Sequence, residues 1–402
     1  MRRRHPAAAR LRTAASAASW VAALWVGAGC GVREVPPPPR AEFLLAAGDS
    51  TFWVRSDSTG LHVRGSPMLL ARFGRRLYEI YAADDDRSYY DAVFVGQRVF
   101  RRDLVSGDSL LVYQDVTVPA LARAYAAAHP DEDPLDPDED ASEEPRTLAT
   151  AEVDVVDLHG PFASFEYHGD VERDGAERSH VTRRGVIDLR TGREVSVADV
   201  FGDTAGARIV AGGRRAFAAA LDSVRRARDP RARRARRAIA AFAFDPRSFA
   251  IVDVDRQPAV EFLVPGRGRR AEGATMPLQP IPAPSAAWWA EVRAVLPQSA
   301  DSTADRWRRP GYEVVARYDS TGAVTLALRD TLRHEWIAGR MPGPAHRIYW
   351  LDRPPLDSAT RHGLARAFDE AALYSDDARS ASLDRRPTPG EIPVVFARYR
   401  RR

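Results

Sequence analysis

The sequence predicts an α+β fold with an antiparallel β-rich N-terminal unit, a central α+β module and a small C-terminal α+β unit. Short runs rich in β-branched and aromatic residues recur about every ten residues between turn residues, which is typical of antiparallel strands. Predicted helices, with apolar residues at helical spacing, come after groups of predicted strands and do not alternate with single strands. This order is typical of an α+β fold. Hydrophobic residues make up 45% of the 402 residues, which is enough to bury the cores of about two or three domains.

The chain begins with a basic stretch followed by an apolar run from Ala14 to Ala28. This run is shorter than the ~20 residues that a membrane-spanning helix needs. It ends Gly-Ala-Gly-Cys, and Cys30 is the only cysteine of the chain. Residues 1–29 resemble a bacterial lipoprotein signal peptide, and the resemblance implies that Cys30 is acylated and becomes the new N-terminus. A plain secretory signal peptide or an uncleaved anchor helix is the alternative.

Residues 30–40 follow as a tether, because four consecutive prolines favour a stiff polyproline II spacer. The leader contains five arginines and no acidic residue, so the formal charge of +4 becomes −1 without it. A nucleic-acid-binding protein needs a basic excess in its folded part. The sequence therefore predicts an exported protein that is lipid-anchored to a bacterial membrane, facing the periplasm or the cell surface, with no nucleic-acid partner.

Residues 41–129 are expected to form the β-rich domain. Strands are predicted at 43–45, 51–54, 61–63, 78–81, 90–95 and 110–113, and a helix at 119–128. The acidic residues 84–86 are expected in a solvated turn, with cation binding as the alternative. Residues 130–147 are rich in acidic residues and proline, which predicts a solvated linker. A calcium loop is the alternative, but the spacing of calcium-loop ligands is missing.

Residues 148–284 are expected to form the central domain. Alternating patterns predict strands at 151–158, 163–167, 185–189, 249–252 and 259–264, and apolar residues at helical spacing predict helices at 205–228 and from 231 to 242. Residues 285–402 are expected to contain a helix at 285–300, a hairpin formed by 312–318 and 323–328, and a helix at 358–374. The tryptophans of this half could form a carbohydrate platform, but core packing is the more common role; they are Trp288, Trp289, Trp307, Trp336 and Trp350.

The stretch from Gly185 to Asp203 reads GVIDLRTGREVSVADVFGD. Its patterned positions are Asp188, Leu189, Thr191, Gly192, Val195, Val197, Asp199, Val200 and Phe201. A Thr-Gly pair supplies a tight turn between strands, and Asp199 can cap the following helix. This pattern resembles the C-terminal domain of lysozyme-sensing anti-sigma factors of the RsiV type, which also occurs beside peptidoglycan deacetylases. The resemblance covers 148–284 and implies an extracytoplasmic α+β domain of a non-catalytic or accessory kind.

Two groups of residues are candidate contact sites. An arginine run includes Arg225, Arg226, Arg233, Arg234 and Arg237. It could bind anionic lipid head groups or another polyanion, pair with the acidic segment at 131–144, or form a solvated helix face. The second group is His168 and His180, which could contact a ligand; a zinc site that adds Asp170 is imaginable, but loop histidines are the favoured interpretation.

No catalytic residues are predicted, because the catalytic and nucleotide-binding motifs of the common enzyme classes are missing. No metal site or cofactor is predicted either. The favoured function is a non-catalytic module that binds peptidoglycan or an envelope protein. The alternatives are an envelope hydrolase or deacetylase with an unrecognised site, and a structural accessory protein of the outer membrane.

Overall fold

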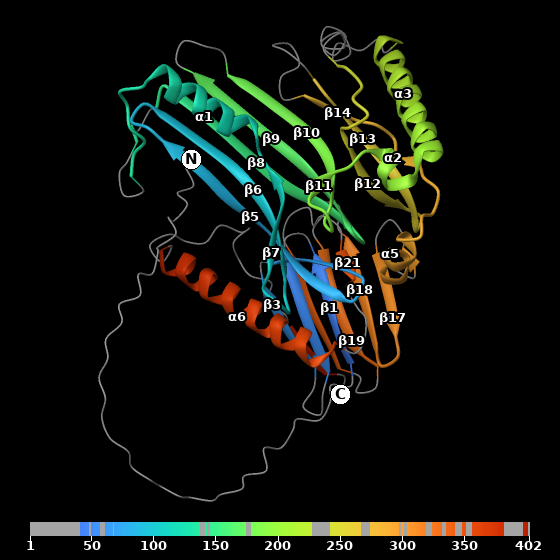
Figure 1. Cartoon of the computed structure of the whole chain (residues 1–402). Helices are drawn as coiled ribbons and strands as arrows, with labels where there is room; N and C mark the ends of the chain where they lie inside the picture. Colours follow the sequence, from blue (N-terminus) through green and yellow to red (C-terminus); the bar gives the residue numbers. More distant parts are fainter. Residues whose placement is uncertain are drawn as a thin grey trace, which may run out of the picture.

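The computed structural model describes most residues between Ala41 and Arg400 (Figure 1). The described ranges are 41–47, 50–56, 61–66, 68–136, 141–142, 145–173, 178–226, 242–266, 274–296, 299–300, 304–318, 324–331, 335–341, 348–350, 356–381 and 397–400. The fold is α+β, as the sequence predicts.

The largest sheet has eight strands in the order β11-β10-β9-β8-β6-β5-β4, and β7 pairs with β6 beside this path. The strands are β4 (Leu69–Phe73), β5 (Arg76–Ser88), β6 (Ala92–Asp103), β7 (Ser109–Gln114), β8 (Thr147–His159), β9 (Phe162–Arg173), β10 (Ser179–Asp188) and β11 (Arg193–Glu194). All neighbours are antiparallel except β6 and β8, which pair in parallel over residues 92–95 and 147–150. The predicted boundary at 130–147 therefore lies between two strands of one sheet.

Helix α1 (Thr117–Ala128) covers one face of this sheet (Figure 1). Its buried residues Val118 and Ala122 pack in the same cluster as Phe94 of β6 and Phe165 of β9. The carboxylate of Asp115 accepts the backbone N–H groups of the first helical residues at 3.0 and 2.9 Å. Asp115 precedes the N-cap residue Val116, and its carboxylate satisfies two N–H groups that have no partner within the helix.

The described part of the acidic segment is hydrogen-bonded to the folded body. The backbone N–H of Leu135 donates to the carbonyl of Ser88 at 2.8 Å. The carboxylate of Glu132 accepts the N–H of Tyr90 at 3.1 Å and the hydroxyl of Tyr125 at 2.9 Å. Polar contacts thus hold part of this segment against the folded body, while Asp131, Asp133, Pro134 and Asp136 are exposed to solvent.

The opposite face of the sheet is covered at one end by a second layer (Figure 1). Its elements are α2 (Val197–Phe201), α3 (Asp203–Arg226), β12 (Phe249–Val254), β13 (Gln257–Pro265), β14 (Thr275–Pro277), β15 (Ile281–Pro282) and α5 (Trp289–Val295). Helix α2 begins with a capping box, in which Asp199 accepts the N–H of Ser196 at 2.8 Å. Ser196 is the N-cap of α2, and Asp199 is its partner in the capping box, so Asp199 caps a short helix that precedes the helix predicted at 205–228.

Two further sheets and helix α6 (Ser358–Ala381) complete the described fold. Strands β1 (Ala41–Ala47), β2 (Ser50–Ser56) and β3 (Leu61–Ser66) form a sheet with β21 (Ile348–Trp350). Strands β16 (Ser299–Ala300), β17 (Ala304–Arg309), β18 (Tyr312–Tyr318), β19 (Val324–Asp330), β20 (Glu335–Met341) and β22 (Ala397–Arg400) form the other. Side chains of α6 share a buried cluster with β2 and β4, including Phe368, Trp53 and Leu70.

Two of the local predictions need correction. The predicted acidic turn at 84–86 lies inside β5, where Asp84 accepts a hydrogen bond from Gln97 of β6 at 3.0 Å. A long twisted strand can carry acidic residues where its face is open to solvent, so composition alone misplaces the turn. Strand β4 has no counterpart among the predicted elements. The helix predicted from 231 to 242 lies almost entirely outside the described residues.

Candidate functional site

The two predicted histidines lie together on the open part of the sheet face opposite α1. His168 of β9 pairs with Thr182 of β10, and His180 of β10 pairs with Asp170 of β9. Because alternate residues of a strand point to opposite faces, these four side chains share one face. We call this group the histidine face. Its four residues come from two neighbouring strands, and the two imidazole rings are 6.3 Å apart.

A continuous chain of polar contacts crosses the histidine face. The Nδ1 atom of His180 lies 2.9 Å from Oδ1 of Asp170, and its Nε2 atom lies 2.9 Å from the hydroxyl of Thr182. That hydroxyl is 3.4 Å from Nδ1 of His168. The Nε2 atom of His168 in turn lies 3.4 Å from a carboxylate oxygen of Glu166. The imidazole of His180 thus lies between a carboxylate and a hydroxyl.

Arg184 links this series of polar contacts to the second layer. Its guanidinium donates to Glu166 of β9 at 2.7 Å and also hydrogen-bonds to Glu261 of β13. Burial would lower the pKa of Arg184, but the hydrogen bonds to both carboxylates outweigh it and raise that pKa above its ordinary value. The residue therefore joins the large sheet to the β12–β13 hairpin at the border of the histidine face.

The structure does not support the zinc site that the sequence suggests as an alternative for His168, His180 and Asp170. Among the residues that the structure describes, no three histidine, cysteine or acidic side chains form a group that could hold a metal ion. Both ring nitrogens of His180 already face hydrogen-bond partners, Asp170 and Thr182. The histidines are thus placed for proton transfer or polar contacts.

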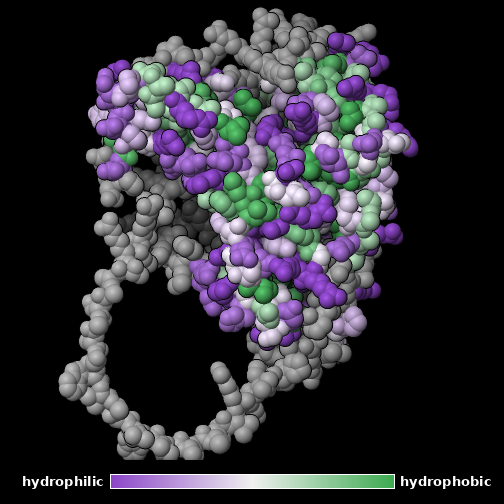
Figure 2. Space-filling model, in the orientation of Figure 1, coloured by the Kyte–Doolittle hydropathy of each residue, from purple (hydrophilic) through white to green (hydrophobic). Residues whose placement is uncertain are grey.

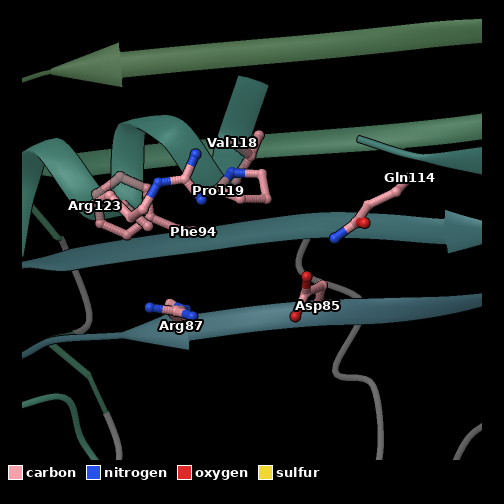
Figure 3. Close-up of a pocket in the computed structure, with 8 residues that line it drawn as sticks. Asp85, Arg87, Phe94, Gln114, Val118, Pro119 and Arg123 are labelled. Atoms are coloured by element: carbon pink, nitrogen blue, oxygen red, sulfur yellow. The ribbon is translucent and has the colours of Figure 1, made fainter. Parts of the chain in front are cut away.

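A small cavity lies on the other face of the sheet, beside α1 (Figure 3). Its volume is about 100 Å³, and its lining residues are Asp85, Arg87, Phe94, Gln114, Val118, Pro119, Ala122 and Arg123. Phe94, Val118 and Ala122 are buried and form an apolar floor. We call this space the α1 cavity.

Two arginines flank the α1 cavity. Arg87 extends from β5 and Arg123 from α1, and both are exposed (Figure 3). Within the described part of the chain, neither guanidinium has a carboxylate oxygen within 4.0 Å. The one carboxylate of the lining, Asp85, lies 3.9 Å from Arg98 instead. The cavity therefore combines two available cationic donors with an apolar floor.

The remaining predicted site residues are only partly described. Arg225 and Arg226 lie in the last turn of α3. Arg225 donates to the carboxylate of Asp222 at 3.3 Å, and Arg226 donates to the backbone carbonyl of Asp222 at 3.1 Å. Contacts of this kind at a helix C-terminus suit the helix dipole. Arg233, Arg234, Arg237 and Cys30 lie outside the described residues.

The tryptophans that the structure describes do not form an exposed platform. Trp289 and Trp307 are fully buried, and Trp288 packs edge-on against Phe162. Core packing is therefore confirmed for Trp288, Trp289 and Trp307. Trp336 and Trp350 lie in strands, and their side chains are outside the description. Figure 2 shows a mostly hydrophilic surface with small, scattered hydrophobic areas on the face in view.

Sequence reasoning missed Arg87, Arg123 and Thr182. Arg87 and Arg123 come from different elements and meet only through the packing of α1 on the sheet. Thr182 could have been predicted, because it follows His180 by two residues in the same strand and therefore lies on the same face of the sheet.

No protein-family model matches the chain, and a search of curated proteins finds no match. Within the described residues, no helix is long and apolar enough to cross a membrane.

Proposed function

We propose that the protein is an exported envelope lipoprotein, anchored through Cys30, whose folded body binds peptidoglycan without catalysis. The leader with its single cysteine supports the anchor, and the resemblance of 148–284 to the RsiV-type domain supports an extracytoplasmic role. The α1 cavity carries the proposal of ligand binding, because convergent polar groups above an apolar floor are the usual features of a ligand site.

The test for binding is sedimentation with purified sacculi. The full-length protein, extracted from membranes in detergent, is mixed with sacculi and centrifuged, with an unrelated lipoprotein as the control. We expect the protein to sediment with the sacculi and to be released as salt rises, because exposed arginines bind through screened charge. Recovery of the protein in the supernatant at low salt would reject peptidoglycan as the ligand.

The anchor is tested separately by metabolic labelling with palmitate. We expect the native chain to take up the label and the Cys30→Ser variant to lose it, because the acyl chain needs the cysteine sulfur. An unlabelled native chain with an intact initiator methionine would refute both export and lipidation.

A second candidate function, a hydrolase, is favoured by the geometry of the histidine face. The order Asp170, His180, Thr182 places a carboxylate at Nδ1 and a hydroxyl at Nε2, both at 2.9 Å. This is the arrangement by which a histidine activates a hydroxyl nucleophile. The Thr182 oxygen would bond to an acyl carbon while its proton moves to His180 and then to the leaving group. Water would release the acyl group in a second step.

Access to the hydroxyl argues against this second function. Thr182 is only 6% exposed, and its oxygen also contacts His168. The test is hydrolysis of p-nitrophenyl acetate by the native chain and by Thr182→Val and His180→Gln. Equal rates for all three would reject the hydrolase, whereas a large loss of rate in both variants would support it over the non-catalytic function.

A further inference from the structure

We propose that the α1 cavity binds the C-terminal carboxylate of a peptidoglycan stem peptide, between Arg87 and Arg123. This inference rests on the proposed function and specifies which part of the ligand is recognised. The chemistry is that of a short peptide whose last residue is the size of alanine and ends in a free carboxylate.

The charge of the lining selects an anion. Two guanidiniums without carboxylate partners in the described structure face a cavity that contains one acidic side chain, Asp85. Guanidinium groups bind carboxylates through charge-assisted hydrogen bonds, often two at a time. A carboxylate between Arg87 and Arg123 would relieve the repulsion between these two cations.

The start of α1 adds no competing anion site. Asp115 already accepts the backbone N–H groups of Thr117 and Val118, so this helix N-terminus is occupied by the chain itself. The side-chain donors of the lining are therefore the two arginines and the amide of Gln114. Their positions on β5 and α1 place them on either side of the cavity (Figure 3).

Size and polarity narrow the ligand further. A volume of about 100 Å³ suits a small terminal group. The floor of Phe94, Val118 and Ala122 suits a methyl group. Asp85 and Gln114 can accept hydrogen bonds from the peptide N–H that precedes the last residue. Stem peptides, which end in alanine carboxylates, meet all these requirements.

The first experiment compares N-acetyl-D-alanyl-D-alanine with its C-terminal amide by titration calorimetry on the intact protein. For a ligand of this size we expect a Kd on the order of 1 mM. The amide, and the variants Arg87→Gln and Arg123→Gln, should each bind about 10-fold more weakly or worse. Arg215→Gln on the exposed side of α3 removes the same charge elsewhere and should leave the Kd unchanged. Equal binding of acid and amide would overturn the assignment.

The second experiment uses sacculi before and after an amidase has removed the stem peptides. We expect the native chain to sediment with intact sacculi only, and Arg87→Gln and Arg123→Gln to lose that binding while their circular dichroism stays native. Equal binding to stripped sacculi would overturn the cavity assignment but leave the proposed function standing. No binding to either preparation would remove both.

Discussion

Loss of Arg184 should weaken the contact between the large sheet and the β12–β13 hairpin. Its side chain is 19% exposed and bonds to two carboxylates, Glu166 and Glu261, on different sheets. The substitution Arg184→Met keeps the apolar stem and removes the charge. Two partly buried carboxylates are then left without their cation.

The expected cost follows from this degree of burial. Removing one partner of a fully buried ion pair costs about 3–5 kcal/mol, whereas a fully exposed pair contributes about 0–1 kcal/mol. With about a fifth of the side chain exposed and two partners lost, Arg184→Met should lower the free energy of unfolding by about 2–3 kcal/mol. On the scale that holds for domains of 150–250 residues, this corresponds to a fall of about 4–12 °C in Tm.

The assay is urea and thermal unfolding, followed by far-UV circular dichroism. Arg178→Met is the matched control, because Arg178 precedes β10, is 64% exposed and pairs with one carboxylate, Asp170, at 3.3 Å. The control should cost less than about 1 kcal/mol. Adding Glu261→Gln to Arg184→Met should recover part of the stability, since one unpaired charge disappears. If Arg184→Met is no more destabilising than Arg178→Met, the bridging role is refuted.

Two further predictions concern close packing and a partly buried phenol. A Cβ atom at Gly363 of α6 would lie 1.9 Å from the carbonyl oxygen of Leu104. In an exposed helix, glycine to alanine stabilises by about 1 kcal/mol, but here Gly363→Ala should destabilise the protein by about 1–3 kcal/mol in thermal unfolding. A variant more stable than the native chain would contradict this close packing. The pKa of Tyr125 is raised to about 12, first by loss of solvent around the phenol and then by the hydrogen bond to Glu132 and the negative charge of Glu132. Because the folded state favours the neutral phenol, this contribution to stability is complete below pH 10 and disappears as the pH rises through about 12. The absorbance difference between the native chain and Tyr125→Phe should therefore titrate near pH 12, and titration near pH 10 would contradict it.

The local elements were predictable because their signals lie within a few residues of one another. Pro119 in the first turn of α1, the Thr-Gly turn before β11 and the capping box at Ser196 all depend on short-range geometry. At Gly192 the backbone φ of +67° is one that glycine adopts without strain. The existence and type of α1, α3, α5 and α6 and of most strands follow from such signals, whereas the short helix α2 was not predicted.

The pairing of distant strands could not be predicted in the same way. Strand β6 joins β8 in parallel across a connection that contains β7, α1 and the acidic segment, and β1 pairs with β21 from the far end of the chain. Nothing in the alternation of either strand specifies its partner, because register depends on the buried face as a whole. The consecutive strands β9 and β10 are a different case, because the sequence already places Asp170 with His168 and His180 as a possible set, and the pairing of His180 with Asp170 bears out their proximity.

The two candidate sites lie on opposite faces of one sheet, and this separates their tests. Phe94 and the α1 cavity share a face with the core under α1, whereas His180 and Asp170 lie on the other face. Mutations more than about 7–10 Å apart without shared partners are usually additive. Arg87→Gln should therefore weaken sacculus binding without changing ester hydrolysis, and His180→Gln should leave sacculus binding intact. If His180→Gln abolished sacculus binding while the protein stayed folded, the ligand would contact the histidine face, and the α1 cavity could not be the whole site.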